Sequence, residues 1–316
     1  MTSFKRILVI VDPMVGWTPA VERASALARA THGAIWLGLF HGGSHLPWYR
    51  SFGDGAPHIE KSLRDRMSDR LRQLAEKVHD HSGADVEVID DRHRVGAHRI
   101  IGFVERHRID VILKDAGHDS AASRLVFVPL DWELLRESAV PVWLTSPATA
   151  HLPRSLAVAV DPAHPVHGAG AINDAILWSA TILANATGAS IQVLTAFPGL
   201  PFEPTLDPLG LGLGWSQGEL LERLRGDHQA AFDELLARHS IRADDGRLLQ
   251  GLPGPTILEW MRKEMAELLV VGNIHRHGAE RVFMGSTAEF LVSRAPCDIL
   301  AIPGIVGASS VSETIL

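Results

Sequence analysis

The residues best suited to binding chemistry lie late in the chain, between Gly272 and Thr287. Gly272 ends an apolar run, and Gly285 precedes Ser286 at the expected start of a helix. Unpaired N–H groups and the positive dipole end at a helix N-terminus attract anions, and glycine lets the backbone approach a phosphate closely. We expect Ser286 or Thr287 to cap this helix, with Glu289 in its first turn. The segment predicts an anion site, although ordinary helix starts also use Gly and Ser.

An Asp-Pro pair follows the first apolar run of each half of the chain, as Asp12-Pro13 and Asp161-Pro162. In an open parallel sheet, ligands bind beyond the carboxyl ends of the strands. A carboxylate at that place could accept hydrogen bonds from a ribose or a base. The alternative is that the Asp caps the following helix or turn while Pro sets its start, and the pair taken alone favours capping.

Ten short apolar runs predict the strands that position these residues. The runs are continuous in Val, Ile and Leu, as strands covered on both faces require, and helical patterns separate them. The predicted strands are 5–11, 34–40, 86–89, 111–113, 140–144, 156–160, 191–196, 247–249, 268–271 and 299–302. Three- and four-residue spacing predicts helix faces made of Leu63, Met67, Leu71, Leu74 and Val78 and of Leu220, Leu221, Leu224, Ala231 and Leu235.

The chain repeats itself at half its length of 316 residues. Residues 111–115 match 268–272, and 134–135 match 291–292, each 157 positions apart. A repeat this long indicates a duplicated domain, because solenoid repeats have periods of about 20–50 residues. We therefore predict an α/β fold of two tandem Rossmann-like domains, each a five-stranded parallel sheet with helices on both faces, related by a pseudo-twofold axis. The predicted bounds are 1–148 and 154–305, followed by a tail at 306–316.

The sequence resembles the universal stress protein family in its tandem two-domain form. Nucleotide-binding members of that family carry Gly, two residues, Gly, nine residues, and then Gly followed by Ser or Thr. Gly272, His275, Gly285 and Ser286 keep this spacing, with His in place of the second glycine. The Asp after each first strand, the turn at 251–253 and the segment at 295–302 match the family as well.

The resemblance implies a domain that holds ATP, with accompanying Mg²⁺ and no other metal, at the carboxyl edge of its sheet. Transferred residue by residue, it places Asp161 by the ribose and adenine and Ala196 at the adenine pocket. It places the glycine segment at the phosphates, with Gly272, Asn273, His275, Gly285, Ser286 and Thr287 as cofactor-binding candidates.

Two departures from the family pattern bear on this site. His275 brings a Cβ and an imidazole to a place where phosphate must come close, although a cationic His275 could instead contact the phosphate. In the first half, the positions that correspond to Gly272, Gly285 and Ser286 are Asp115, Val128 and Pro129. An acidic side chain would face the phosphates there, and Pro129 has no N–H to donate. We expect no ATP site in the first half, and we interpret Asp131 as a helix cap.

An apolar segment rich in Pro and Gly spans residues 197–215, and it suits neither a helix nor a strand. Exposed to water it would form a large apolar patch, so we expect it to cover the other domain, a second chain or an apolar ligand. Packing within the chain or in a dimer is the favoured interpretation. The apolar side chains concerned are Phe197, Leu200, Phe202, Leu206, Leu209, Leu211, Leu213 and Trp215.

Composition argues against several classes of protein. A formal charge of −7 without a basic block makes nucleic acid a poor candidate partner. The single cysteine, Cys297, excludes an intrachain disulfide and a multi-thiolate metal site, and we expect it in the core. The 17 histidines are expected to be scattered over the surface. Hydrolase and P-loop motifs are missing from the sequence. No apolar run approaches the length of a signal-peptide core or of the ~20 residues that span a membrane.

These observations predict a cytoplasmic stress-response protein that binds a small-molecule ligand or a partner without substrate turnover. ATP in the second domain is the candidate ligand. One alternative is a binder of apolar or lipid-like ligands that uses residues 197–215. Another is slow ATP hydrolysis or nucleotide-gated signalling through the second domain. The apolar segment is also compatible with a homodimer, and no stable membrane insertion is expected.

Overall fold

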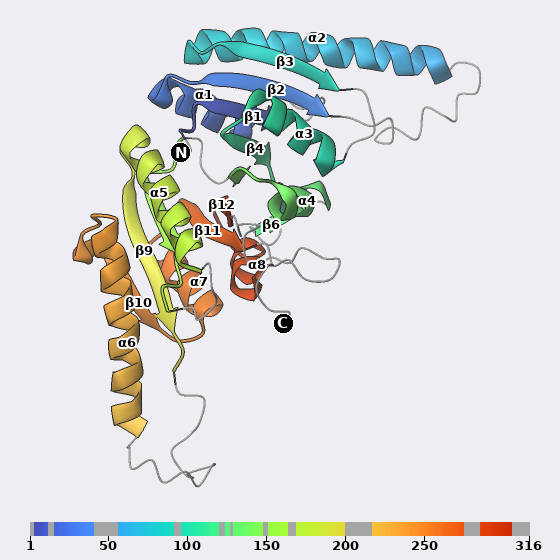
Figure 1. Ribbon diagram of the computed structural model, residues 1–316. Coiled ribbons are helices and arrows are strands. Elements are labelled where there is room, and N and C mark those ends of the chain that lie inside the picture. The colour runs from blue at the N-terminus through green and yellow to red at the C-terminus, as the bar shows by residue number, and fades with distance from the viewer. Residues whose placement is uncertain are drawn as a thin grey trace, which may run out of the picture.

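The computed structural model describes residues 3–11, 16–40, 56–91, 96–119, 124–126, 129–147, 151–163, 169–199, 217–274 and 285–304. Its strands in the first half are β1 (Arg6–Ile10), β2 (Ala34–Phe40), β3 (Val86–Asp91), β4 (Val111–Asp115) and β7 (Val142–Thr145). Those in the second half are β8 (Ser155–Ala159), β9 (Ser190–Phe197), β10 (Gly246–Gln250), β11 (Leu268–Ile274) and β12 (Asp298–Gly304). In the described residues they form one ten-stranded sheet, in the order β10-β9-β8-β11-β12-β7-β4-β1-β2-β3 (Figure 1).

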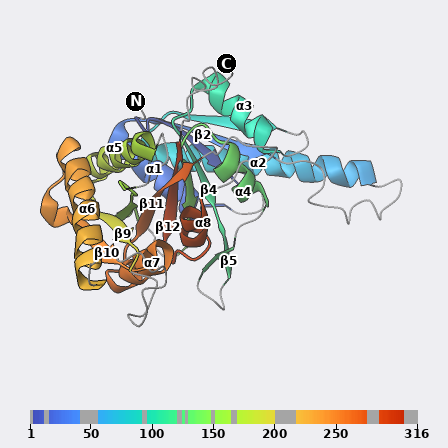
Figure 2. The ribbon, with the colours of Figure 1, turned by 60° about the horizontal axis from the view of Figure 1, so that its bottom comes forward.

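Helices cover both faces of this sheet. They are α1 (Pro19–Thr31), α2 (Ala56–Ser82), α3 (Ala97–His107), α4 (Pro129–Glu137), α5 (Ala169–Thr187), α6 (Gln217–Arg238), α7 (Pro253–Lys263) and α8 (Ser286–Val292), with a short 3₁₀ turn at Ala243–Asp245. Residues of α1, α2, α5 and α6 build the core on one face, and those of α3, α4, α7 and α8 build the core on the other. The helices α2 and α6 lie at opposite ends of the molecule, and α1 contacts α5 between them (Figures 1 and 2).

Successive residues of the central strands enter opposite cores. Val9 of β1 and Val270 of β11 pack on the α1/α5 face, whereas Leu8 and Leu269 pack on the α3/α7 face, and all four are fully buried. A strand that is buried on both sides needs an apolar side chain at every position, because successive side chains point to opposite faces. This requirement explains why the strand segments read as continuous apolar runs.

The two halves meet where β7 and β12 pair, and this pair is antiparallel whereas every other neighbour in the ten-stranded sheet is parallel. Trp143 pairs with Leu300 at the centre of the seam, flanked by Leu144 with Ile299 and Val142 with Ala301. Trp143 and Leu300 are 157 positions apart, which is the offset of the sequence repeat. Equivalent residues of the two copies therefore face each other, as a local twofold axis at this pair requires.

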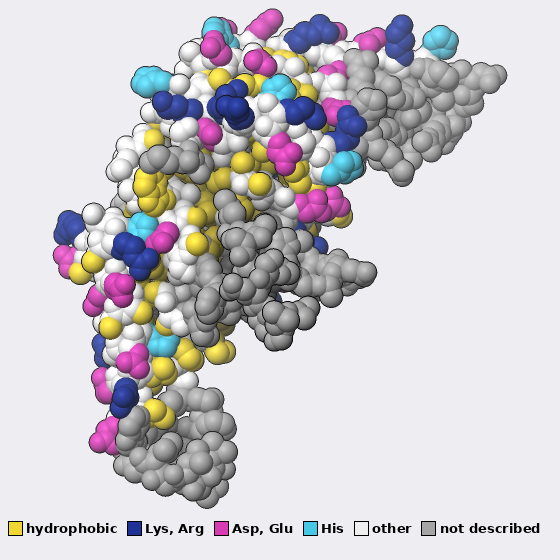
Figure 3. Space-filling view, in the orientation of Figure 1, with side chains coloured by type: hydrophobic (Ala, Val, Ile, Leu, Met, Phe, Trp, Pro, Cys, Tyr) yellow, Lys and Arg dark blue, Asp and Glu magenta, His cyan; other side chains and the backbone are white. Residues whose placement is uncertain are grey.

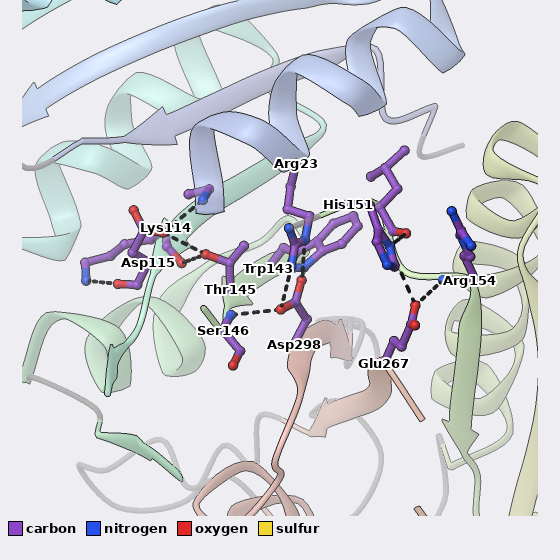
Figure 4. A network of polar contacts seen from close by, with 12 residues as sticks. Arg23, Lys114, Asp115, Trp143, Thr145, Ser146, His151, Arg154, Glu267 and Asp298 are labelled. Carbon is purple, nitrogen blue, oxygen red and sulfur yellow. Dashed lines mark hydrogen bonds and ion pairs between the residues drawn. The ribbon is translucent and has the colours of Figure 1, made fainter. Parts of the chain in front are cut away.

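A buried ion pair crosses the same seam (Figure 4). Arg23 Nε of α1 lies 2.9 Å from Asp298 Oδ2 at the start of β12, and both side chains are fully buried. The carboxylate of Asp298 also accepts hydrogen bonds from Trp143 Nε1 at 3.0 Å and from the Ser146 backbone N–H at 2.8 Å. A helix and a strand of the first half thus hold one carboxylate of the second half.

The α/β class and the two tandem Rossmann-like halves predicted from the sequence are confirmed, and each predicted apolar run overlaps a strand, although 5–11, 140–144 and 156–160 extend past β1, β7 and β8. The short antiparallel pair β5 (Gly117–Asp119) and β6 (Arg124–Val126) was not predicted. The expectation that Leu220 lies on a buried helix face is wrong, because its side chain is 42% exposed near the start of α6. The proposed domain bounds stay a prediction.

Candidate functional site

A cavity of about 160 Å³ lies at the carboxyl edge of the second half, beside the end of β8. Strand β8 sits between β9 and β11, so the strands that follow it in sequence lie on opposite sides of it. Ligands of open α/β sheets bind at such a switch point. The described lining comprises Ala159, Val160, Asp161, Ile172, Asn173, Ile176, Ala196, Pro253, Ile257, Val271, Gly272, Gly285, Ser286, Thr287, Ala288 and Leu291.

Six of the predicted cofactor-binding residues meet at this cavity: Asp161, Ala196, Gly272, Gly285, Ser286 and Thr287. Two faces of its wall are apolar, with Ile172 and Ile176 of α5 on one side of the sheet and Ile257 and Leu291 of α7 and α8 on the other. Polar groups stand at the rim, where Asp161, Ser286 and Thr287 are exposed. An apolar slot with a few polar groups is the usual form of a small-molecule site.

Asp161 follows β8 and is held by a helix side chain. Asn173 of α5 accepts a hydrogen bond from the Asp161 backbone N–H at 3.0 Å and donates one to the Asp161 carbonyl at 2.9 Å. Helix α5 begins at Ala169, and α1 has Thr18 as its N-cap. Asp161 is therefore not the N-cap of α5, and capping of the following helix is wrong for this pair. Residues 162–163 form a turn, so capping of that turn stays a prediction.

The two glycines of the site have different surroundings. A Cβ added to Gly272 would lie 2.7 Å from Ile172 Cγ1 and 2.8 Å from Ile176 Cδ1, so a side chain there would press against α5 at the cavity wall. Gly285 has no described atom within 4 Å of such a Cβ, and its φ of −58° suits any residue. Gly272 is needed for close packing, whereas Gly285 leaves space open.

The start of α8 differs in one respect from the expectation. The helix begins at Ser286, as predicted, and Glu289 lies in its first turn. Its N-cap is Gly285, without a side-chain cap bond, so the prediction that Ser286 or Thr287 caps it is wrong. The two hydroxyl residues occupy the first two helical positions instead. Because α8 has only seven residues, its N-terminus alone does not indicate a ligand site, and the case for one rests on the cavity.

Asn273 is 2% exposed in β11 opposite Pro303 of β12, outside the described cavity lining, and its Oδ1 has no hydrogen-bond partner among the described residues. His275 lies outside the described residues, as do Asp12, Val128 and residues 200–215 of the apolar segment. Phe197, which opens that segment, is 2% exposed at the end of β9, with its ring 5.9 Å from that of His228.

In the first half, the position that corresponds to Gly272 carries a hydrogen-bonded carboxylate (Figure 4). Asp115 stands 157 positions before Gly272, and its Oδ1 accepts hydrogen bonds from the Ala20 backbone N–H at 2.9 Å and from Thr145 Oγ1 at 3.0 Å. The carboxylate thus binds the first turn of α1. Beside it, Lys114 Nζ lies 2.8 Å from the fully buried Asp131. Asp131 is therefore part of a buried ion pair at the third position of α4, rather than the N-cap that we expected.

A family model described as the universal stress protein family matches residues 3–146 and again residues 156–303. The chain belongs to the universal stress protein family. Its two matches are the two halves of the sheet, which places the cavity in the second universal stress protein unit.

Relatives that match over nearly the whole chain share about a quarter of its sequence. The chain is 26% identical to universal stress protein E of Photorhabdus laumondii over 306 residues, 96% of each chain. It is also 26% identical to universal stress protein E of Escherichia coli strain K12 over 317 residues, 96% of this chain and 95% of that protein.

Two solved structures share the whole fold. A protein of unknown function from Pseudomonas aeruginosa PAO1 superposes with a TM-score of 0.70 at 19% identity, covering 96% of this chain and 94% of that one. A universal stress protein from Archaeoglobus fulgidus DSM 4304 gives a TM-score of 0.66 at 16% identity, covering 95% and 98%.

Charge distribution, possible metal ligands and the core cysteine can be described for the same residues. Lys, Arg, Asp and Glu side chains are interspersed on the face shown in Figure 3. Within the described ranges, no three His, Cys, Asp or Glu side chains gather as a metal site requires, and no helix is long and apolar enough to cross a membrane. Cys297 is buried, and that burial raises the pKa of its thiol well above the ordinary range, as expected of a core cysteine.

Sequence reasoning missed the residues that reach the cavity from helices. Asn173, Ile176 and Ile257 belong to α5 and α7, and nothing in the local sequence distinguishes the two isoleucines from ordinary helix residues. Asn173 is a polar residue within an apolar helix face, and this was the one signal that could have been noticed.

Proposed function

We propose that the second half of this universal stress protein binds an adenine nucleotide in the cavity beside β8. The observation that carries the proposal is the convergence there of four residues predicted from widely separated segments: Asp161, Ala196, Gly272 and Gly285. Strand ends, a helix start and a glycine that cannot carry a side chain without pressing on α5 are the parts that a nucleotide site of this family needs.

The chemistry of the wall fits the two ends of such a ligand differently. Ile172, Ile176 and Ile257 offer apolar surface to a flat base, and the exposed carboxylate of Asp161 could accept hydrogen bonds from ribose hydroxyls. Drug-sized ligands fill pockets of about 300–1,000 Å³. A cavity of about 160 Å³ therefore holds a base, and the phosphates would extend past the rim at Ser286. ATP, when bound, would bring negatively charged phosphates, and Mg²⁺ would accompany them.

We propose that the first half holds no nucleotide in this way. Asp115 brings a carboxylate to the place of Gly272 and already binds the first turn of α1. Pro129 occupies the first position of α4 and has no N–H to offer an anion. A phosphate there would be repelled by the Asp115 carboxylate and would receive no hydrogen bond from the nitrogen of Pro129.

Binding without turnover is the third part of the proposal. The described lining of the cavity carries one ionisable side chain, that of Asp161. Hydrolysis of ATP needs groups that position water and stabilise the departing phosphate. A cytoplasmic, stress-related role and a small-molecule ligand are the functional setting that we propose, and a homodimer stays a prediction from the sequence.

The test is a calorimetric titration of the purified chain with ATP and Mg²⁺, paired with an assay for released phosphate. We expect saturable binding that Asp161→Ala weakens by about tenfold, because a charge-assisted hydrogen bond contributes about 1.5 kcal/mol or more. We expect no phosphate release above the rate in buffer. Absence of binding at millimolar ATP would refute the nucleotide site. Phosphate release that Asp161→Ala abolishes would show turnover.

A further inference from the structure

We propose that Asn173 is a positioning residue for the ligand site, acting by holding Asp161 at the rim of the cavity. The inference rests on the proposed nucleotide site and adds a residue that affects binding through Asp161. Asn173 belongs to α5, twelve positions beyond Asp161, and is 3% exposed.

The side-chain amide of Asn173 takes the place of a neighbouring strand. Its Oδ1 accepts from the Asp161 N–H at 3.0 Å while its Nδ2 donates to the Asp161 carbonyl at 2.9 Å. One amide orientation satisfies both bonds, since the oxygen can only accept and the NH₂ group can only donate. Both backbone groups of a single residue are thereby fixed to one side chain.

This bond pair lies where the sheet no longer supports the chain. Strand β8 ends at Ala159, and the next bond toward β9 is that of the Val160 N–H to the Leu194 carbonyl at 3.0 Å. Asp161 follows, with an exposed side chain. Helix α5 is anchored by the fully buried Leu177 and Ala180, so Asn173 presents its amide from a rigid element. Functional side chains need such support to keep a productive geometry.

The first half stabilises its corresponding edge by other means. There the Val11 N–H bonds the Gly38 carbonyl at 3.0 Å, just as the Val160 N–H after β8 bonds that of Leu194, but α1 starts at Pro19 with Thr18 as its N-cap. The first turn of α1 is bound by the carboxylate of Asp115. In the second half, Asn173 both holds the Asp161 backbone and lines the cavity.

A double-mutant cycle on ATP affinity tests this role. Calorimetric titrations with ATP and Mg²⁺ compare the wild type, Asn173→Ala, Asp161→Ala and the double variant. We expect each single variant to weaken binding by about tenfold and the double variant to bind no more weakly than Asp161→Ala. This pattern arises because Asn173 acts through Asp161, so its loss has no further effect once the carboxylate is gone.

Two matched variants separate positioning from general damage to α5. Asp174 is the next residue, and its Oδ1 lies 2.7 Å from His239 Nε2 and 3.2 Å from Arg238 Nη1 of α6. We expect Asp174→Ala to leave ATP affinity unchanged. Ile176 lines the cavity on the same helix, and Ile176→Ala combined with Asp161→Ala should give multiplied losses, because the isoleucine contacts the ligand independently. A purely structural role of Asn173 would not produce non-additivity confined to Asp161.

Each outcome decides a different claim. Non-additivity between Asn173→Ala and Asp161→Ala alone supports the positioning role. Wild-type binding together with an unaffected Asn173→Ala variant, or with multiplied losses in the double variant, would overturn the positioning role and leave the nucleotide site standing. A wild type that does not bind ATP would remove the proposed function, and the positioning role with it.

Discussion

Arg23 and Asp298 form a fully buried ion pair, 2.9 Å between Nε and Oδ2, that joins the two copies of the duplicated domain. The residues come from opposite ends of the chain, 275 positions apart. A buried charge is costly unless it is paired and hydrogen-bonded, and Trp143 and Ser146 supply the additional donors to the carboxylate. The pair therefore makes the folding of each half depend on the other.

Arg23→Met should destabilise the whole chain strongly. The substitution leaves the Asp298 carboxylate buried without its cation, which costs about 3–5 kcal/mol in comparable pairs. The measurement is the free energy of unfolding in urea. A control, Arg72→Met, breaks an exposed pair with Asp69 and should change stability by less than about 1 kcal/mol. Similar effects of both variants would show that the seam pair does not stabilise the fold.

The same variant should show a steeper pH dependence of stability than the wild type, in which the pKa of the Asp298 carboxyl is already raised. Burial raises the pKa of the Asp298 carboxyl, while the charge of Arg23 and the bonds from Ser146 and Trp143 lower it. Without Arg23 the folded-state pKa rises further, whereas the unfolded chain releases this proton above about pH 4. Between those values the folded state binds more protons, so stability falls as pH rises. The destabilisation by Arg23→Met should be larger at pH 7 than at pH 5; an equal loss at both pH values would contradict it.

Gly285→Asp should abolish ATP binding without unfolding the protein. No described atom obstructs a side chain at Gly285, and Asp is a favourable N-cap for α8. The added carboxylate would enter the cavity rim and repel the phosphates. Calorimetric titration with ATP and a thermal melt of the same sample provide the two readings. Gly285→Ser is the matched control, since it caps the helix without adding charge, and it should retain more affinity than Gly285→Asp.

Gly272→Ala should affect stability and binding together. Its Cβ would lie within 3 Å of Ile172 and Ile176, and overpacking of a core costs about 1–3 kcal/mol. Urea unfolding would measure this loss. Gly170→Ala, in the first turn of α5 where nothing described lies within 4 Å of an added Cβ, should cost no stability. A Gly272→Ala variant as stable as the wild type would show that α5 can move away from β11.

Asp115→Ala should weaken the first half without affecting the nucleotide site. The carboxylate accepts the Ala20 N–H in the first turn of α1, and loss of such a cap costs about 0.5–2 kcal/mol. We expect a lower unfolding free energy and unchanged ATP affinity. A change in ATP affinity would mean that the edge of the first half communicates with the cavity of the second.

The strands could be predicted from sequence because a strand buried on both faces needs an apolar residue at every position. Continuous runs such as 111–113 and 268–271 have no other simple interpretation between helical patterns. The repeat offset of 157 also predicted the pseudo-twofold relation that Trp143 and Leu300 display at the seam. The ion pair of Arg23 with Asp298 could not be predicted, because no local pattern shows which helix faces which strand across 275 residues.

The candidate site was predictable where the chain marks strand ends and helix starts. Asp161 and Gly285 stand at such points, Gly272 ends an apolar run although β11 continues to Ile274, and the structure brings all three to one cavity. Helix residues were missed, since an apolar side chain that reaches a site from the middle of a packed face, as Ile176 does, looks like any other. The capping of α8 was mispredicted because Gly285 itself takes the N-cap, one position before the hydroxyl residues that usually do so.

The most direct test of the account is the number of ATP molecules bound per chain, measured by equilibrium dialysis at saturating ATP and Mg²⁺. The account predicts one molecule per wild-type chain and none for Gly285→Asp, because we place the nucleotide in the cavity of the second half and expect the Asp115 carboxylate to repel phosphate in the first. Two molecules per chain, or one that persists in Gly285→Asp, would contradict it.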